Sequence, residues 1–312
     1  MRWRRSPRVD GDFDAVAQSV ERVATLLSAG VPAHLAWQHS GAETASATPE
    51  STAAAVVMQA AAAVGAGRSA ASAIVAATES GSGWRVVAAA WMVAEQGGAP
   101  AAASLARLSE ALRDDAQARR EVAAALAGPV ASARLVAWLP LVALLFGSLL
   151  GFDTLHVLTT SPIGMVCVAA GGLLLWAGAR WCARLVHDAR AVTSASGLRL
   201  ELLAIALGGG SSLVGAKAAV DHAVATCGLA GGAEASDRTA DSAAAMGAPI
   251  GPLLRAEASR QRREARTEAS ARAARLGVRL LIPLGVCTLP AFVLLGVLPM
   301  LIAVVADTVA AT

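Results

Sequence analysis

Three long apolar runs interrupt an otherwise amphipathic chain. The runs are Leu135–Phe152, Ile163–Ala179 and Leu280–Ala306, and none contains Asp, Glu, Lys or Arg. A helix needs about 20 apolar residues to cross the hydrocarbon core of a bilayer. The first two runs reach this length with their flanks, and the third exceeds it alone. The predicted transmembrane helices are therefore 131–152, 163–181 and 280–306.

Outside these runs, apolar residues follow helical spacing. Val16, Val20, Val23 and Leu27 recur every three or four positions, as on one face of an α-helix. Segments bounded by Gly or Pro predict further helices at 50–64, 68–78, 84–97 and 101–127, and no segment shows the alternation of a strand. The sequence predicts an all-α integral membrane protein with three transmembrane helices and two cytoplasmic helical-bundle domains, 12–130 and 182–279.

Glycine and proline turns recur in both predicted domains. Gly30 ends the first helix and Pro32 suits the first turn of the next. The segment "ALGGGSSLVGA", which contains Gly210, has the same order of helix, glycine break and helix. These breaks are predicted to shape the two domains.

A Gly-Ala-Pro turn opens a long, Arg-rich helix in each domain. Gly98 and Pro100 form this turn in the first domain, and Gly247 and Pro249 form it in the second. From glycine break to Gly-Ala-Pro turn the interval is 68 residues in the first copy and 37 in the second. This recurrence indicates an internal duplication with an abridged second copy.

Each long helix leads into a predicted span with an early proline, Pro140 in the first copy and Pro283 in the second. The last span also contains Pro290 and Pro299. At about 100° per residue, Pro283 and Pro290 fall on nearly one face. Carbonyls freed by proline must be satisfied inside a bilayer, which favours a span packed within a bundle. The alternatives left open are a bent, compliant span and simple tolerance of proline.

Composition and charge agree with a membrane protein and orient it. The chain is 55% hydrophobic and 16% charged, against about 25% charge in soluble domains. Arginines flank the cytoplasmic ends of the three spans, and the loop 153–162 has neither Lys nor Arg. The positive-inside rule then places this loop and the tail 307–312 outside, and the N-terminus inside. The basic tail 1–11 is either solvated or resting on anionic lipid.

Signals for chemistry are mostly negative. The segment "GGGSSLVGAK" lacks the GK[ST] of a phosphate loop, the histidines show no metal spacing, and the four cysteines form no CxxC pair. We expect no enzyme activity and no cofactor. Glu95, before the first Gly-Ala-Pro turn, is interpreted as a surface residue or as a carboxylate presented to a partner or cation.

Charged residues on the long helices favour solvated or docking surfaces. Glu110, Asp114, Asp115 and Glu121 alternate with arginines at helical spacing. The run Arg255–Arg279 holds eight Arg and three Glu, but it leads directly into the last span and interleaves alanine instead of aromatics. It is therefore predicted to be a juxtamembrane helix, and nucleic acid is not an expected partner.

The combined plan resembles a known family. "LLSAGVPAHLAW" and "AAWMVAEQGGAPAAASLARLSEALR" are similar to two motifs of the F-domain family, the inner-membrane platform proteins of type II secretion and type IV pilus machines. The segment "ARREVAAALAGPVASARLVAWLPLVALLFGSLLGFDTLHVL" resembles its actinobacterial Tad (Flp) pilus branch. "RLGVRLLIPLGVCTLPAFVLLGVLP" resembles the end of that branch's partner subunit.

The resemblance implies a function and partners. Such a protein would lie in the bacterial inner membrane and contact a separate hexameric secretion ATPase through its cytoplasmic domains. It would couple that motor to extraction and polymerisation of pilin or pseudopilin subunits, as a homo-oligomer or with a related platform subunit. Two alternatives stay open on the sequence: a transporter or permease subunit, and a membrane-anchored scaffold without an ATPase partner.

Overall fold

A computed structural model describes residues 10–47, 52–77, 81–149, 162–190, 197–229, 233–246, 249–299 and 301. All regular secondary structure in these ranges is helical, which confirms the all-α prediction. The chain divides into two compact units. Unit 1 comprises residues 1–120 and 193–266, and unit 2 comprises residues 121–192 and 267–312. The predicted domain limits at 130, 182 and 279 thus fall inside unit 2 and stay predictions.

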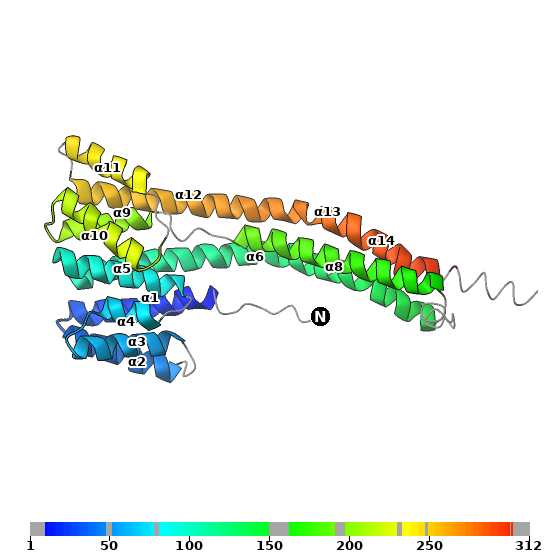
Figure 1. The fold of residues 1–312 in the computed structure, drawn as a ribbon, viewed down its shortest axis with the longest axis horizontal. Helices are drawn as coiled ribbons and strands as arrows, with labels where there is room; N and C mark the ends of the chain where they lie inside the picture. Colours follow the sequence, from blue (N-terminus) through cyan, green and yellow to red (C-terminus); the bar gives the residue numbers. More distant parts are fainter. Residues whose placement is uncertain are drawn as a thin grey trace, which may run out of the picture. The chain divides into compact units, whose positions relative to one another are not determined.

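Successive helices of the first helix set in unit 1 run in opposite directions (Figure 1). It consists of α1 (Asp10–Ser28), α2 (Ala33–Ala47), α3 (Thr52–Gly65), α4 (Ala70–Ala77), α5 (Ser82–Gly97) and the start of α6 (Ala101–Leu149). On α1, Val16, Val20 and Val23 are fully buried, as the periodicity predicts. α6 does not stop near residue 127 but continues without interruption into the segment predicted to be the first span.

The second helix set is shorter. It consists of α9 (Leu198–Gly208), α10 (Leu213–Thr226), α11 (Ala233–Ala245) and the start of α12 (Ile250–Arg279). Aligned by their turns, α9 and α10 match α1 and α2, α11 matches α5, and α12 matches α6. Within the described residues, the second set therefore has no counterparts of α3 and α4, which explains the shorter interval between its glycine turns.

The two helix sets share one hydrophobic core. Trp37, Ile74 and Trp84 from the first set belong to the same buried cluster as Leu203 and Leu254 from the second. α9 and α10 both pack against α5. Burying one Leu or Ile side chain contributes about 1.5–3 kcal/mol. The abridged set lacks two helices that could cover α9, and α5 supplies that cover.

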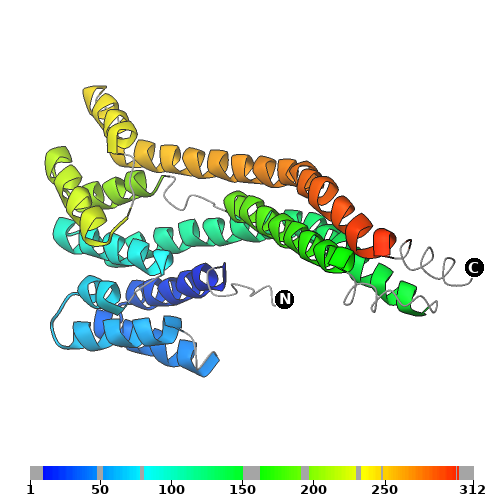
Figure 2. The same cartoon turned by 45° about the vertical axis from the view of Figure 1, so that its right-hand side comes forward.

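Unit 2 holds α8 (Pro162–Arg190) beside an irregular continuation of α12. This continuation consists of α13 (Leu281–Pro283), a π-helical stretch η1 (Leu284–Thr288), α14 (Leu289–Phe292) and a second π-helical stretch η2 (Val293–Val297). α8 contacts η1, α14 and η2, and the green and red ribbons lie side by side in Figures 1 and 2. The bundle packing inferred from the prolines is therefore present in unit 2.

The structure offers two candidate membrane spans where the sequence predicts three. Pro162–Val186 and the continuous helix Ile250–Val297 are long and apolar enough, and only 22% and 39% of their most apolar windows are buried. The core helix of a soluble protein would be largely buried, so both helices fit membrane insertion. The remaining predicted span, 131–152, is the first in the sequence; it lies on the C-terminal part of α6, and residues 150–152 are outside the described ranges.

The π-helical stretches change the interpretation of the prolines. Proline has no N–H to donate, so the regular i to i−4 ladder cannot continue through it. η1 lies between Pro283 and Pro290, and η2 follows Pro290. A π turn holds more residues than an α turn. The step of about 100° per residue assumed for Pro283 and Pro290 therefore does not hold, and spacing alone does not place them on one face.

Candidate functional site

The predicted turn residues adopt conformations that require glycine. Gly30, Gly98 and Gly210 have φ of +84°, +65° and +87°, a region that side chains with a Cβ rarely adopt. The Gly30 N–H donates to the Leu27 carbonyl at 3.0 Å, and the Val31 N–H donates to the Leu26 carbonyl at 3.0 Å. These bonds satisfy carbonyls that the helix end leaves without partners.

The prolines after these turns open the next helices. The carbonyls of Pro32 and Pro100 accept hydrogen bonds from the N–H groups of Ala36 and Ser104, both at 3.0 Å. Pro249 does the same for Leu253 at 3.4 Å. Gly247, the fourth predicted turn glycine, lies outside the described residues.

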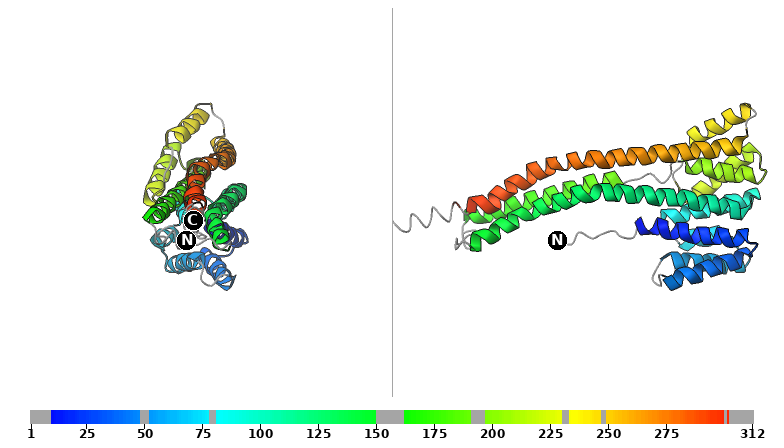
Figure 3. Two further views of the ribbon diagram at one scale, coloured as in Figure 1. Left: turned by 90° about the vertical axis from the view of Figure 1, so that its right-hand side faces the viewer. Right: turned by 180° about the vertical axis from the view of Figure 1, so that it is seen from behind.

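Two further glycines, which were not singled out from the sequence, bring the repeated turns into contact. A Cβ added to Gly209 would overlap the carbonyl oxygen of Gly97. The α5–α6 and α9–α10 connections therefore touch backbone to backbone, at one end of unit 1 (Figure 3, right). The triplet "GGG" was the available signal, but one sequence cannot show which of its glycines meets another segment.

Glu95 links two helices of the bundle. Its carboxylate accepts hydrogen bonds from Trp91 Nε1 at 2.5 Å and from Ser69 Oγ at 2.6 Å. Trp91 in turn packs edge-on against Trp37, with ring centroids 5.4 Å apart. No cluster of three or more His, Cys, Asp or Glu suited to a metal occurs in the part of the chain that the structure describes. Glu95 thus fastens the start of α4 to α5.

Some residues on the charged helix faces form ion pairs within the chain. On α6, Arg113 pairs with Glu21 and Arg120 pairs with Asp14, so these residues attach α6 to α1. On α12, Arg260 pairs with Glu257 and Glu264. These contacts reduce the number of charges left to serve as the docking surface predicted from the sequence.

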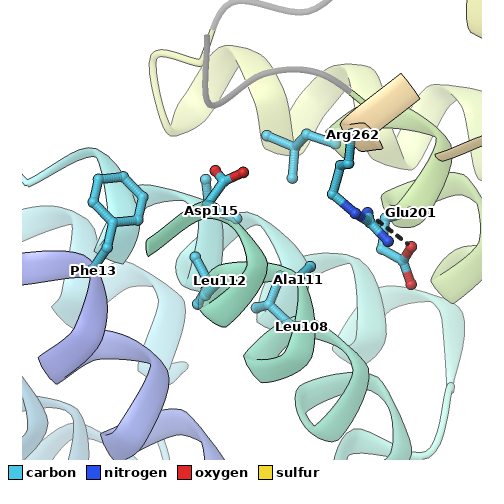
Figure 4. Close-up of a pocket in the computed structure, with 9 residues that line it drawn as sticks. Phe13, Leu108, Ala111, Leu112, Asp115, Glu201 and Arg262 are labelled. Atoms are coloured by element: carbon cyan, nitrogen blue, oxygen red, sulfur yellow. Dashed lines mark ion pairs between the residues drawn. The ribbon is translucent and has the colours of Figure 1, made fainter. Parts of the chain in front are cut away.

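A buried charge cluster lies where α6, α9 and α12 meet (Figure 4). Glu201 on α9 is only 4% exposed, and its Oε2 lies 3.6 Å from Nη1 of Arg262 on α12. Asp115 on α6 lines the same small pocket. Burial raises the pKa of Asp115 from 3.8 to about 6, against the attraction of Arg119 and Arg262. Asp115 is half-buried, so it is less solvated than its alternation with arginines suggests.

A second buried charge, that of Arg199, links the helices of the second set through ion pairs. Arg199 on α9 is 5% exposed and donates hydrogen bonds to Asp221 on α10 and Asp237 on α11. Burial opposes its charge, but the two carboxylates outweigh burial and raise its pKa. The arrangement joins three helices, α9, α10 and α11. No local pattern signals it, because Asp221 and Asp237 are distant from Arg199 in the chain.

The prolines of the predicted spans show different surroundings. Pro283 is buried and its carbonyl oxygen lies near Gly178 of α8, while Pro290 is half-buried. Pro140 lies within α6, and its side chain is outside the description. Pro283 therefore lies against a neighbouring helix, α8.

Comparison with known proteins supports one family. Residues 19–149, from within α1 to the end of α6, match the family model described as Type II secretion system (T2SS), protein F. No curated protein and no solved structure matches the chain. The match covers the first helix set and the segment after it, and supports in general a secretion or pilus platform protein of the inner membrane.

Proposed function

We propose that this chain is an inner-membrane platform protein of a type II secretion or Tad-type pilus machine. The observation that carries the proposal is the match of residues 19–149 to the protein F family. This segment contains a helical bundle whose last helix, α6, continues without a break toward an apolar run. A load applied to the bundle would pass along such a helix into the membrane.

The platform would act without catalytic chemistry of its own. A separate cytoplasmic ATPase would supply the energy, and the platform would couple its motion to the extraction of pilin or pseudopilin from the membrane. We propose three spans with the N-terminus inside, and association with further platform subunits. Arginines at the inner ends of the spans support this orientation.

Co-purification tests the partner directly. The full chain, tagged and solubilised in mild detergent, is expected to retain a secretion ATPase from the same cells. Deleting the gene is expected to abolish surface pili or secretion, and the wild-type gene is expected to restore them. The proposal fails if the ATPase does not associate and the deletion leaves assembly intact. Export of a small solute lost in the same deletion would favour the permease alternative.

A further inference from the structure

A second pocket in unit 1 has a volume of about 180 Å³. It is lined by the α5–α6 turn and first turns of α6, by α9, and by Arg255 of α12. One water needs about 10–15 Å³ of such space, so the pocket has room for a polyatomic ligand. Its polar side chains are Ser104, Arg107, Glu201 and Arg255.

Cationic charge is in excess in this pocket. Glu201 is the pocket's one carboxylate, and its ion pair is with Arg262, at 3.6 Å. Among the described residues, neither Arg107 nor Arg255 forms an ion pair or a hydrogen bond. Two guanidinium groups therefore face one cavity without a partner, while the negative charge beside them is already shared.

The surroundings make this excess unfavourable. Burial and the neighbouring Arg107 lower the pKa of Arg255, although Glu201 opposes the shift. The first N–H groups of α6, next to the same pocket, have no intrahelical acceptors and add positive potential.

We propose that this pocket binds a small oxyanion of the phosphate class. Arginine donates paired, planar hydrogen bonds that match phosphate oxygens. At pH 7 a phosphate group carries a charge of about −1.5 to −2, which matches the two unpaired cations. A single carboxylate side chain would neutralise only one of them. The site is independent of the proposed function, because binding is measured on this chain alone.

Titration calorimetry on the full chain in detergent tests the site, with inorganic phosphate as the probe and ionic strength held constant with chloride. Saturable binding is expected. Arg107→Gln and Arg255→Gln should each weaken it by about tenfold or more, because each removes a charge-assisted contact. Arg263→Gln, an exposed change on the same helix, should leave affinity unchanged. Circular dichroism checks that each variant is folded.

Glu201→Gln provides an opposite change that keeps the test decisive if an arginine variant fails to fold. Removing the negative charge from the pocket should tighten phosphate binding. A nucleoside diphosphate probes the source of the phosphate: tighter binding than inorganic phosphate indicates a nucleotide, and equal or weaker binding indicates the free ion.

Three results would overturn the proposal. The first is equal binding by wild type and the Arg107→Gln/Arg255→Gln double variant. The second is loss of all binding at physiological chloride concentration, which would indicate an adventitious ion only. The third is tighter binding of a glutamate-rich peptide than of phosphate or nucleotide, since the pocket would then receive an acidic protein segment.

Discussion

The surroundings of a charged residue depend on the fold, as three residues of unit 1 show: Asp115, Glu201 and Arg199. Asp115 has the same sequence surroundings as its exposed neighbour Asp114, yet it lines a pocket between α6 and α12. Glu201 and Arg199 lie on an almost wholly buried helix, and partners from other helices offset their charges. A buried charge is tolerated only when paired, so these residues fix where neighbouring helices can sit.

Asp115 should make stability depend on pH between about 4 and 6. Its pKa is 3.8 ordinarily and about 6 in the fold. In this window the folded chain holds a proton that the unfolded chain has lost, so stability falls as pH rises and is level above 6. About two pKa units correspond to about 3 kcal/mol. Asp115→Asn should remove this slope and raise stability at pH 7.5 by an amount of that order.

Asp114→Asn is the matched control for this measurement. Asp114 is the adjacent, exposed carboxylate, and its repulsion is the smallest of the causes that shift the pKa of Asp115, so its replacement should leave most of the slope in place. Unfolding of the full chain in detergent, followed by circular dichroism from pH 4 to 8, gives both profiles. A steeper or unchanged slope in Asp115→Asn would contradict a raised pKa of Asp115 as the cause of the pH dependence.

At the scale of elements, the α5–α6 and α9–α10 turns can touch only because the two residues that meet there are glycines, which have no side chain. Gly97 and Gly209 meet backbone to backbone, which allows α9 and α10 to pack against α5. This contact joins the two helix sets, so its tightness affects the common core.

Gly209→Ala should separate these turns. The new Cβ would overlap the Gly97 carbonyl oxygen, a backbone atom that cannot rotate away. Overpacking of this kind costs about 1–3 kcal/mol or more. Gly208→Ala is the control, because a Cβ there meets nothing within 4 Å, and alanine favours a helix by about 1 kcal/mol. Thermal unfolding should show opposite shifts for the two variants, and equal shifts would refute the contact.

The pairing of α8 with the proline-containing helix also rests on glycine. Gly171 and Gly178 lie seven residues apart, against Leu295 and Cys287 respectively. Small residues let membrane helices approach closely. This pair of glycines was not singled out from the sequence.

Gly178→Ala should loosen this helix pair. Its Cβ would lie 2.9 Å from Cys287 Cβ, an atom fixed to the backbone. Gly172→Ala on the same helix adds a Cβ with nothing within 4 Å. In detergent, Gly178→Ala should lower the unfolding temperature and expose unit 2 to proteolysis earlier, while Gly172→Ala should do neither. Resistance equal to wild type in both would exclude close packing at Gly178.

At the scale of the whole molecule, the two helix sets of unit 1 differ in size. The first set forms a bundle of helices, and the second has fewer helices and packs its apolar surface against α5. The second set should therefore not fold without the first, because Leu203 and Leu254 would lose the surface that buries them.

Orientation in the membrane gives a prediction for the complete chain. A periplasmic reporter enzyme fused after Asp307 should be active, because three spans starting inside leave the C-terminus outside. The same reporter fused after Thr193, beyond the second predicted span, should be inactive. An inactive reporter after Asp307 would contradict the proposed span count or orientation.

Local sequence patterns were sufficient to predict a structural feature where the interactions that determine it lie within a few residues of the chain. Gly30, Gly98 and Gly210 were identifiable because a helix end with positive φ favours glycine. The buried face of α1 followed from its periodicity. Contacts between distant segments, such as Glu201 with Arg262 or Gly97 with Gly209, leave no such trace in one sequence.

The sequence by itself determined the helical class, most helix positions in unit 1 and the apolar runs. These depend on periodicity, turn chemistry and composition, which are local properties of the chain. Only the tertiary structure decided that both helix sets share a core, that Asp115 lines a pocket together with Arg262, and that the prolines accompany π-helical turns. These outcomes depend on which surfaces of distant segments meet, and packing selects those partners.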